Sequence, residues 1–177
     1  MHRLALIDFE ASCLPEYGRS YPIEVAVALV EGGSRSWLIR PHAAWIGWDW
    51  SAEAEALHGI SPSLLQRDGL PAERVLTEMA TFVNGRPVYA DADLDAYWLE
   101  VLAHAAARPA PFPVRFLGEY LVEQGYTRAE VVAALDAARL SLPTAHVARD
   151  DASRLALAVR LLREARNSGS GLCMTGA

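Results

Sequence analysis

Apolar residues along this chain recur with two kinds of spacing. Alternating or short continuous apolar runs predict strands, whereas apolar positions three and four residues apart predict helices. The strand pattern occurs at residues 4–10, 21–31, 36–39, 88–90 and 114–116. The helical pattern occurs at residues 51–57, 71–83, 94–107, 118–124, 127–138 and 148–165. Because strands and helices alternate after the first three strands, we expect an α/β fold with helices packed on a mixed five-stranded sheet.

Turn residues indicate how these elements connect. Gly32 and Gly33 separate the second and third strands and predict a β-hairpin against the first strand, which would then be central. We interpret the proline-rich run at residues 108–113 as a connector, because too little chain follows it for a second core. We therefore expect one domain over residues 1–166, followed by a flexible tail over residues 167–177 that is rich in Gly and Ser.

The composition is that of an ordinary soluble protein, with 52% hydrophobic and 21% charged residues in a chain of 177. No apolar run approaches the roughly 20 residues that span a bilayer, and the first residues lack the order of a signal peptide. A cytoplasmic location is the expectation that follows. Cys13 and Cys173 lie far apart in sequence, which favours two free thiols over a disulfide framework or a structural zinc site.

The net charge of −6 excludes one class of nucleic-acid protein. A protein that holds long DNA or RNA by neutralising phosphates needs an excess of basic residues. An enzyme that grips only the end of a strand does not, because bound metal ions can supply positive charge at the reacting phosphate.

Two acids follow the apolar run at the start of the chain. Asp8 and Glu10 are two residues apart, so in a strand their side chains point to the same face. Neighbouring carboxylates repel and are costly to desolvate, and a hard divalent cation such as Mg²⁺ or Mn²⁺ would neutralise them. The alternative is that the strand ends at Ile7 and that both acids are solvated.

Further acids follow the fourth strand and precede the last helix. Asp91, Asp93 and Asp95 come directly after residues 88–90, although acids at the start of a helix also interact favourably with its dipole. His146 precedes Asp151 by five residues, which corresponds to roughly 140° around a helix. We therefore expect His146 in the loop before the last helix, folded over the site, with Asp151 pointing into it.

Together these segments resemble a known family. Asp8-Phe9-Glu10, Leu94-Asp95 and the run from His146 to Ala152 are similar, in order and separation, to the three motifs of the DEDDh (DnaQ-like) 3′-to-5′ exonuclease superfamily. The resemblance covers residues 3–165. The opening Asp-Phe-Glu-Ala-Ser-Cys is most similar to the ERI-like and RNase T-like branch, and residues 57–61 also resemble a segment of that branch.

The resemblance implies a ribonuclease H-like fold with helices on both faces of the sheet. It implies that the ligands of two Mg²⁺ or Mn²⁺ ions are four carboxylates, and that the general base is a histidine. Carried over to this sequence, the ligands are Asp8, Glu10, Asp95 and Asp151, and the base is His146. In the family, water attacks the last phosphodiester bond and releases a nucleoside 5′-monophosphate. An imidazole can accept the proton of that water at neutral pH.

The sequence departs from the family pattern in its second motif. Ala90-Asp91 stands where a His-Asn pair is usual, and Leu94 replaces a Phe. Asp91 and Asp93 therefore remain rivals of Asp95, which we favour because Leu94 to Leu99 keeps the register of the motif. Asp150 is likewise a rival of Asp151.

Four residues are candidates for contact with the substrate. We expect contacts to the substrate from the backbone amide of Ala11, where many relatives have Thr, and from Ser12, Trp48 and His58. The tryptophans of the loop at residues 41–51, namely Trp45, Trp48 and Trp50, can stack on bases or close one end of the core. His58 can equally be structural.

We thus expect a metal-dependent 3′-to-5′ exonuclease that acts on single-stranded DNA or RNA ends or short oligonucleotides, with RNA weakly favoured. The alternative is a nuclease-like module that binds nucleic-acid ends or a polymerase without turnover. The sequence leaves the oligomeric state open, and a homodimer is one possibility.

Overall fold

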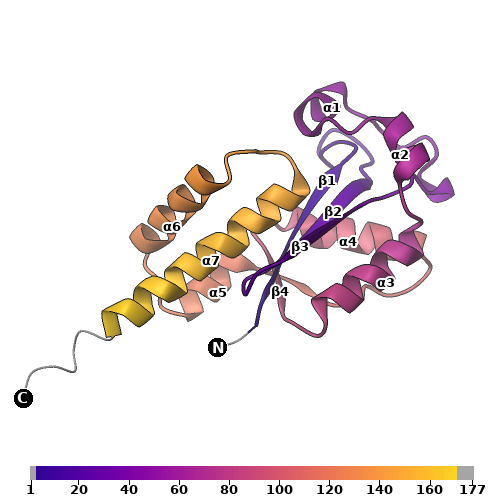
Figure 1. The fold of residues 1–177 in the computed structure, drawn as a ribbon. Coiled ribbons are helices and arrows are strands. Elements are labelled where there is room, and N and C mark those ends of the chain that lie inside the picture. Colours follow the sequence, from indigo (N-terminus) through magenta and orange to yellow (C-terminus); the bar gives the residue numbers. More distant parts are fainter. Residues whose placement is uncertain (1–2, 171–177) are drawn as a thin grey trace, which may run out of the picture.

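A mixed sheet of five strands forms the centre of the structure, a computed structural model that describes residues 3–170 (Figure 1). The strand order is β3-β2-β1-β4-β5. The strands are β1 (Ala5–Ala11), β2 (Pro22–Leu29), β3 (Ser34–Leu38), β4 (Val88–Ala90) and β5 (Val114–Phe116). β1 pairs with β2 in the antiparallel sense and with β4 in the parallel sense, so the first strand is central, as its sequence predicts.

Helices cover both faces of this sheet. The helices of the structure are α1 (Ala52–His58), α2 (Pro62–Asp68), α3 (Ala72–Val83), α4 (Leu94–Ala105), α5 (Leu117–Glu123), α6 (Arg128–Ser141) and α7 (Ala148–Ser170). The α3 and α4 helices pack on one face, and α7 packs on the other with α5 and α6 beside it (Figure 1). The expected α/β class, with a mixed five-stranded sheet and helices on both faces, is confirmed.

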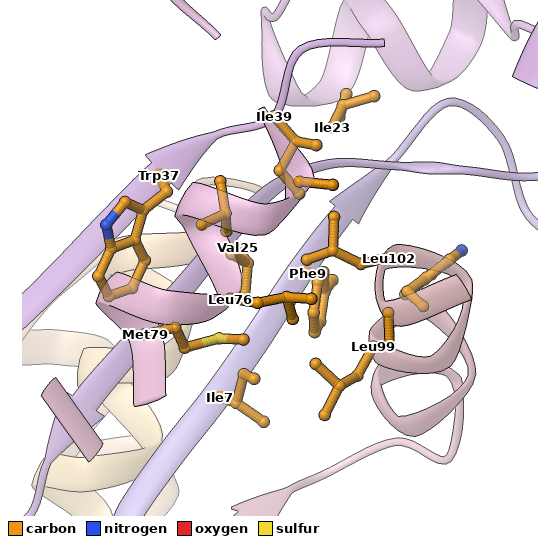
Figure 2. Packing of buried hydrophobic residues seen from close by; sticks show 14 of the residues in the cluster. Ile7, Phe9, Ile23, Val25, Trp37, Ile39, Leu76, Met79, Leu99 and Leu102 are labelled. Carbon is orange, nitrogen blue, oxygen red and sulfur yellow. The ribbon is translucent and has the colours of Figure 1, made fainter. Parts of the chain in front are cut away.

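The side chains of β1 alternate between the two cores. Ile7 and Phe9 lie between Leu76 and Met79 of α3 and Leu99 and Leu102 of α4, as Figure 2 shows. The residues at even positions, Leu4 and Leu6, belong instead to the core beneath α7. Since side chains in a strand alternate, Asp8 and Glu10 continue this even series on the α7 face. The pleat of one strand thus decides which helix the two acids meet.

Two local elements differ from the sequence prediction. The α2 helix was not predicted, although Ser61 and Pro62 are standard start signals: the Ser61 hydroxyl accepts a hydrogen bond from the Leu64 amide at 3.2 Å, and Pro62 occupies the first helical turn. The segment was too short to show a clear period. The α7 helix continues to Ser170, into the stretch expected to be a tail. Residues 171–177 lie outside the described residues.

All three rings of the tryptophan loop pack against the core on the α3 and α4 face of the sheet. Trp45 is buried and stacks on Tyr21 with ring centroids 5.3 Å apart, and the Trp50 indole donates a hydrogen bond to Glu55 at 2.7 Å. Trp48 is only partly buried and carries the Arg19 guanidinium 5.8 Å from its ring centroid. Packing therefore accounts for all three rings, and base contact by Trp48 stays a prediction.

Within the described part of the chain, no helix combines the length and apolar character that a membrane crossing requires. Cys13 is buried and has a free thiol, and Cys173 lies outside the described residues.

Candidate active site

Three carboxylates meet where β1 ends against the first turn of α7. Asp8, Glu10 and Asp151 each offer an oxygen atom, and these atoms all lie within 4.8 Å of one another. The first two come from the even positions of β1, and the third comes from the helix that packs on that face. Hard divalent cations prefer such oxygen ligands, so this donor set fits Mg²⁺ or Mn²⁺.

Asp95 contacts β1 from α4, the helix that packs on the other face of the sheet from α7. It stands in the first turn of α4, is 3% exposed, and accepts a hydrogen bond from the Phe9 amide through Oδ1 at 3.0 Å. Asp93 is exposed at the start of this helix, and Asp91 is exposed at the end of β4. Of the three acids that follow β4, Asp95 is the one in direct contact with the strand that carries Asp8 and Glu10.

The acids destabilise one another's charged forms. Burial, followed by repulsion from Asp95, Glu10 and Asp151, raises the pKa of Asp8 to about 10. Burial and the charge of Asp151 raise the pKa of Glu10 to about 7. Burial also raises the pKa of Asp95 to about 7. A cation that bound among these groups would reverse this effect, since opposite charge favours the ionised form.

A fifth acid, Glu24, was not identified from the sequence. It lies on β2 directly opposite Glu10, is 8% exposed, and has a raised pKa because of burial. The nearby Ser36 hydroxyl and Ala148 amide lower this pKa and partly offset the effect of burial. The available signal was a lone acid in the otherwise apolar run Pro22–Leu29.

His146 and His58 lie on one side of the acids. They line a cavity of about 220 Å³ together with Glu10, Ala11 and Trp98. His146 is exposed in the loop before α7, as its sequence position predicts, with a left-handed φ of 59°. The Ile60 amide donates a hydrogen bond to Nδ1 of His58 at 3.0 Å, whereas Nε2 is enclosed without a hydrogen-bond partner. Buried polar atoms without a partner are uncommon, so His58 stays a candidate for a role in the site.

The other two predicted substrate contacts do not line this cavity. Ser12 is fully buried, and its hydroxyl accepts a hydrogen bond from the Tyr21 amide at 3.2 Å. Trp48 does not line this cavity. The structure therefore brings Ala11 and His58 together beside Glu10, whereas neither Ser12 nor Trp48 lines this cavity.

A second cavity also borders the acids. It measures about 240 Å³ and is bounded by Asp8, Asp91 and Asp151, by Arg139 and Arg154, and by apolar residues of α5, α6 and α7. Asp8 and Asp151 line this cavity, whereas Glu10 lines the cavity beside His146.

Proteins of known structure share this fold. The nuclease domain of 3′hExo, described as a DEDDh family member bound to rAMP, matches 92% of this chain and 92% of its own, with a TM-score of 0.66 and 21% identity. Exonuclease I from Methylocaldum szegediense matches 94% of this chain with a TM-score of 0.67 and 18% identity. E. coli Exonuclease I in complex with a dT13 oligonucleotide matches 97% of it with a TM-score of 0.67 and 11% identity.

These similarities confirm, at the level of the fold, the resemblance to DEDDh exonucleases and the ribonuclease H-like architecture. This chain spans 41% and 43% of the two Exonuclease I chains. No family model matches the sequence, and a comparison with curated protein sequences finds no match.

Proposed function

We propose that this chain is a metal-dependent 3′-to-5′ exonuclease of the DEDDh superfamily. The observation that carries the proposal is the meeting of Asp8, Glu10 and Asp151 within 4.8 Å, with Asp95 hydrogen-bonded to the same strand. These are the four acids that the motifs select. The shared fold with exonucleases supports the same conclusion.

The four carboxylates would hold two Mg²⁺ or Mn²⁺ ions. When bound, such ions stabilise the attacking and leaving oxygens of an in-line phosphoryl transfer. Asp8 and Glu10 would fix the ion positions from the rigid central strand, and Asp151 would complete the site from α7. His146, in the loop above Glu10, would accept the proton of the attacking water.

The substrate we propose is the 3′ end of a single-stranded or short nucleic acid, from which a nucleoside 5′-monophosphate is released. The cavity beside His58 and Trp98 offers an aromatic wall to the terminal nucleotide. Among the similar structures, one is bound to rAMP and one to a dT13 oligonucleotide, so both sugar types are candidates. Rates on matched RNA and DNA oligomers would decide between them.

The direct test uses 5′-labelled oligonucleotides with Mg²⁺ or Mn²⁺. We expect stepwise shortening from the 3′ end, loss of activity in Asp8→Ala, and full activity in the control Asp136→Ala, whose residue is exposed on α6. Binding of oligonucleotide without shortening, under either metal, would favour the binding module instead. Equal activity in Asp8→Ala would refute the proposed site.

A further inference from the structure

Arg154 lies inside the candidate site, one helical turn beyond Asp151. Its side chain is 14% exposed, and its guanidinium makes three hydrogen bonds. Nη1 donates to Oδ1 of Asp151 at 2.6 Å, Nε donates to the Leu142 carbonyl at 3.1 Å, and Nη2 donates to the Thr144 carbonyl. A single planar group therefore joins a proposed metal ligand to the loop before α7.

The contacts of Asp151 extend this connection. Its second oxygen, Oδ2, accepts a hydrogen bond from the Val147 amide at 3.2 Å. Both oxygens are thus oriented by the protein, and each retains a lone pair for a cation because an ionised carboxylate has about four acceptor positions. The loop is held at Leu142, Thr144 and Val147, on both sides of His146.

The loop needs such restraint. His146 has a φ of 59°, in the left-handed region, which is unfavourable for a residue other than glycine. Thr144, Ala145 and His146 are exposed, so packing contributes little to holding them. Hydrogen bonds from a buried guanidinium fix both the position and the orientation of such a segment.

Charge alone does not explain the arrangement. Among the proposed ligands, Asp151 is the one that forms an ion pair within residues 3–170, and its partner is Arg154. A lysine at position 154 could also have supplied the positive charge. A lysine ammonium has no planar fork with which to reach a carboxylate and two carbonyls at once. The use of all three guanidinium nitrogens indicates that the link to the loop matters as well as the charge.

We propose that Arg154 is a positioning residue that couples Asp151 to the loop of His146. Its hydrogen bonds would fix the distance and orientation of the proposed base relative to the proposed metal ligand. The inference rests on the proposed exonuclease function. It identifies a residue outside the three motifs that affects the rate through its hydrogen bonds to Asp151 and to the loop.

The test compares Arg154→Ala and Arg154→Lys with Arg160→Ala, a control at an exposed position on the same helix. Loss of a group that orients a metal ligand lowers activity about 10- to 100-fold. We expect kcat of Arg154→Ala to fall by this factor, KM for the oligonucleotide to change less than about threefold, and Arg154→Lys to recover little. Arg160→Ala should match the wild type.

Two further measurements separate positioning from general loss of structure. Guanidinium ion at non-denaturing concentration should restore part of kcat in Arg154→Ala but none in His146→Ala. Hydrogen exchange of the peptide over residues 142–147 should be faster in Arg154→Ala than in wild type, with the sheet unchanged. If the alanine variant does not fold, the same comparisons with Arg154→Lys decide the matter.

Several results would overturn the inference. An unchanged kcat in a folded Arg154→Ala protein would do so. Tighter Mg²⁺ binding by Arg154→Ala without loss of rate would do so too, because it would show that Arg154 acts only as a counter-ion. Equal exchange of the loop in both proteins would do so as well. Because exchange needs no activity, a wild-type protein that cleaves no oligonucleotide would refute the proposed function while leaving the coupling open to measurement.

Discussion

Replacing Asp8 by Asn should stabilise the metal-free protein. In the fold, burial and the neighbouring acids raise the pKa of Asp8 from 3.8 to about 10, whereas the unfolded chain exposes the carboxyl to water. At pH 7 the folded protein must therefore keep a proton that the unfolded chain releases. Asn has nearly the same shape and needs no proton, so it removes this penalty.

The size of the effect follows from the two pKa values. The pKa of Asp8 is higher in the folded protein than in the unfolded chain. The protonated carboxyl therefore causes no loss of stability below about pH 3.8, and the free energy of unfolding falls as the pH rises from there toward about 10. Neutral pH lies about three pH units above 3.8, and each unit corresponds to about 1.4 kcal/mol. The penalty is thus about 4 kcal/mol at pH 7 and about 1–2 kcal/mol at pH 5.

The assay is urea denaturation in the presence of EDTA, at pH 5 and at pH 7. We expect the free energy of unfolding of Asp8→Asn to exceed that of the wild type by about 2–4 kcal/mol at pH 7, and by less at pH 5. Asp136→Asn, at an exposed ion pair on α6, should change it by less than about 1 kcal/mol at both pH values.

Mg²⁺ at about one hundred times its dissociation constant should remove most of this difference. A ligand that binds only the folded state stabilises it, by about 2.7 kcal/mol at one hundred times its dissociation constant. The wild type should gain this stabilisation, and Asp8→Asn should gain little of it. A lower free energy of unfolding for Asp8→Asn in EDTA at pH 7 would show that the acids do not repel one another as the fold requires.

Three other predictions address the base, the core and a helix start. His146→Gln should lower kcat by about 10²- to 10⁴-fold while Mg²⁺ binding in calorimetry stays unchanged; an unaltered kcat would exclude the residue as base. Leu76→Ala, in the core between α3 and the sheet, should lower the free energy of unfolding by about 2–5 kcal/mol in urea titrations, and a loss below that range would indicate repacking. Thr127→Ala removes the capping box of α6 and should cost about 1 kcal/mol in the same titrations, with nuclease activity retained.

Sequence pattern alone predicted the five strands and the central place of the first one. The reason is local: apolar residues repeat with the period of each element, and turn residues separate them. Because strand side chains alternate, the spacing of Asp8 and Glu10 also placed both acids on one face before any fold was known. The order of the motifs added Asp95, His146 and Asp151 as candidates.

Tertiary structure decided what no local period can encode. Asp95 is distinguished from Asp91 and Asp93 by the Phe9 amide, 86 positions away in the sequence, which it meets only because α4 packs against β1. Glu24 stands opposite Glu10 through the register of β1 and β2. Arg154 joins Asp151 to two backbone carbonyls of a loop. Every residue has a backbone carbonyl, so the sequence does not indicate which carbonyls a side chain will meet. The chain thus determines which chemical groups are present, and packing between distant segments determines which of them can act together.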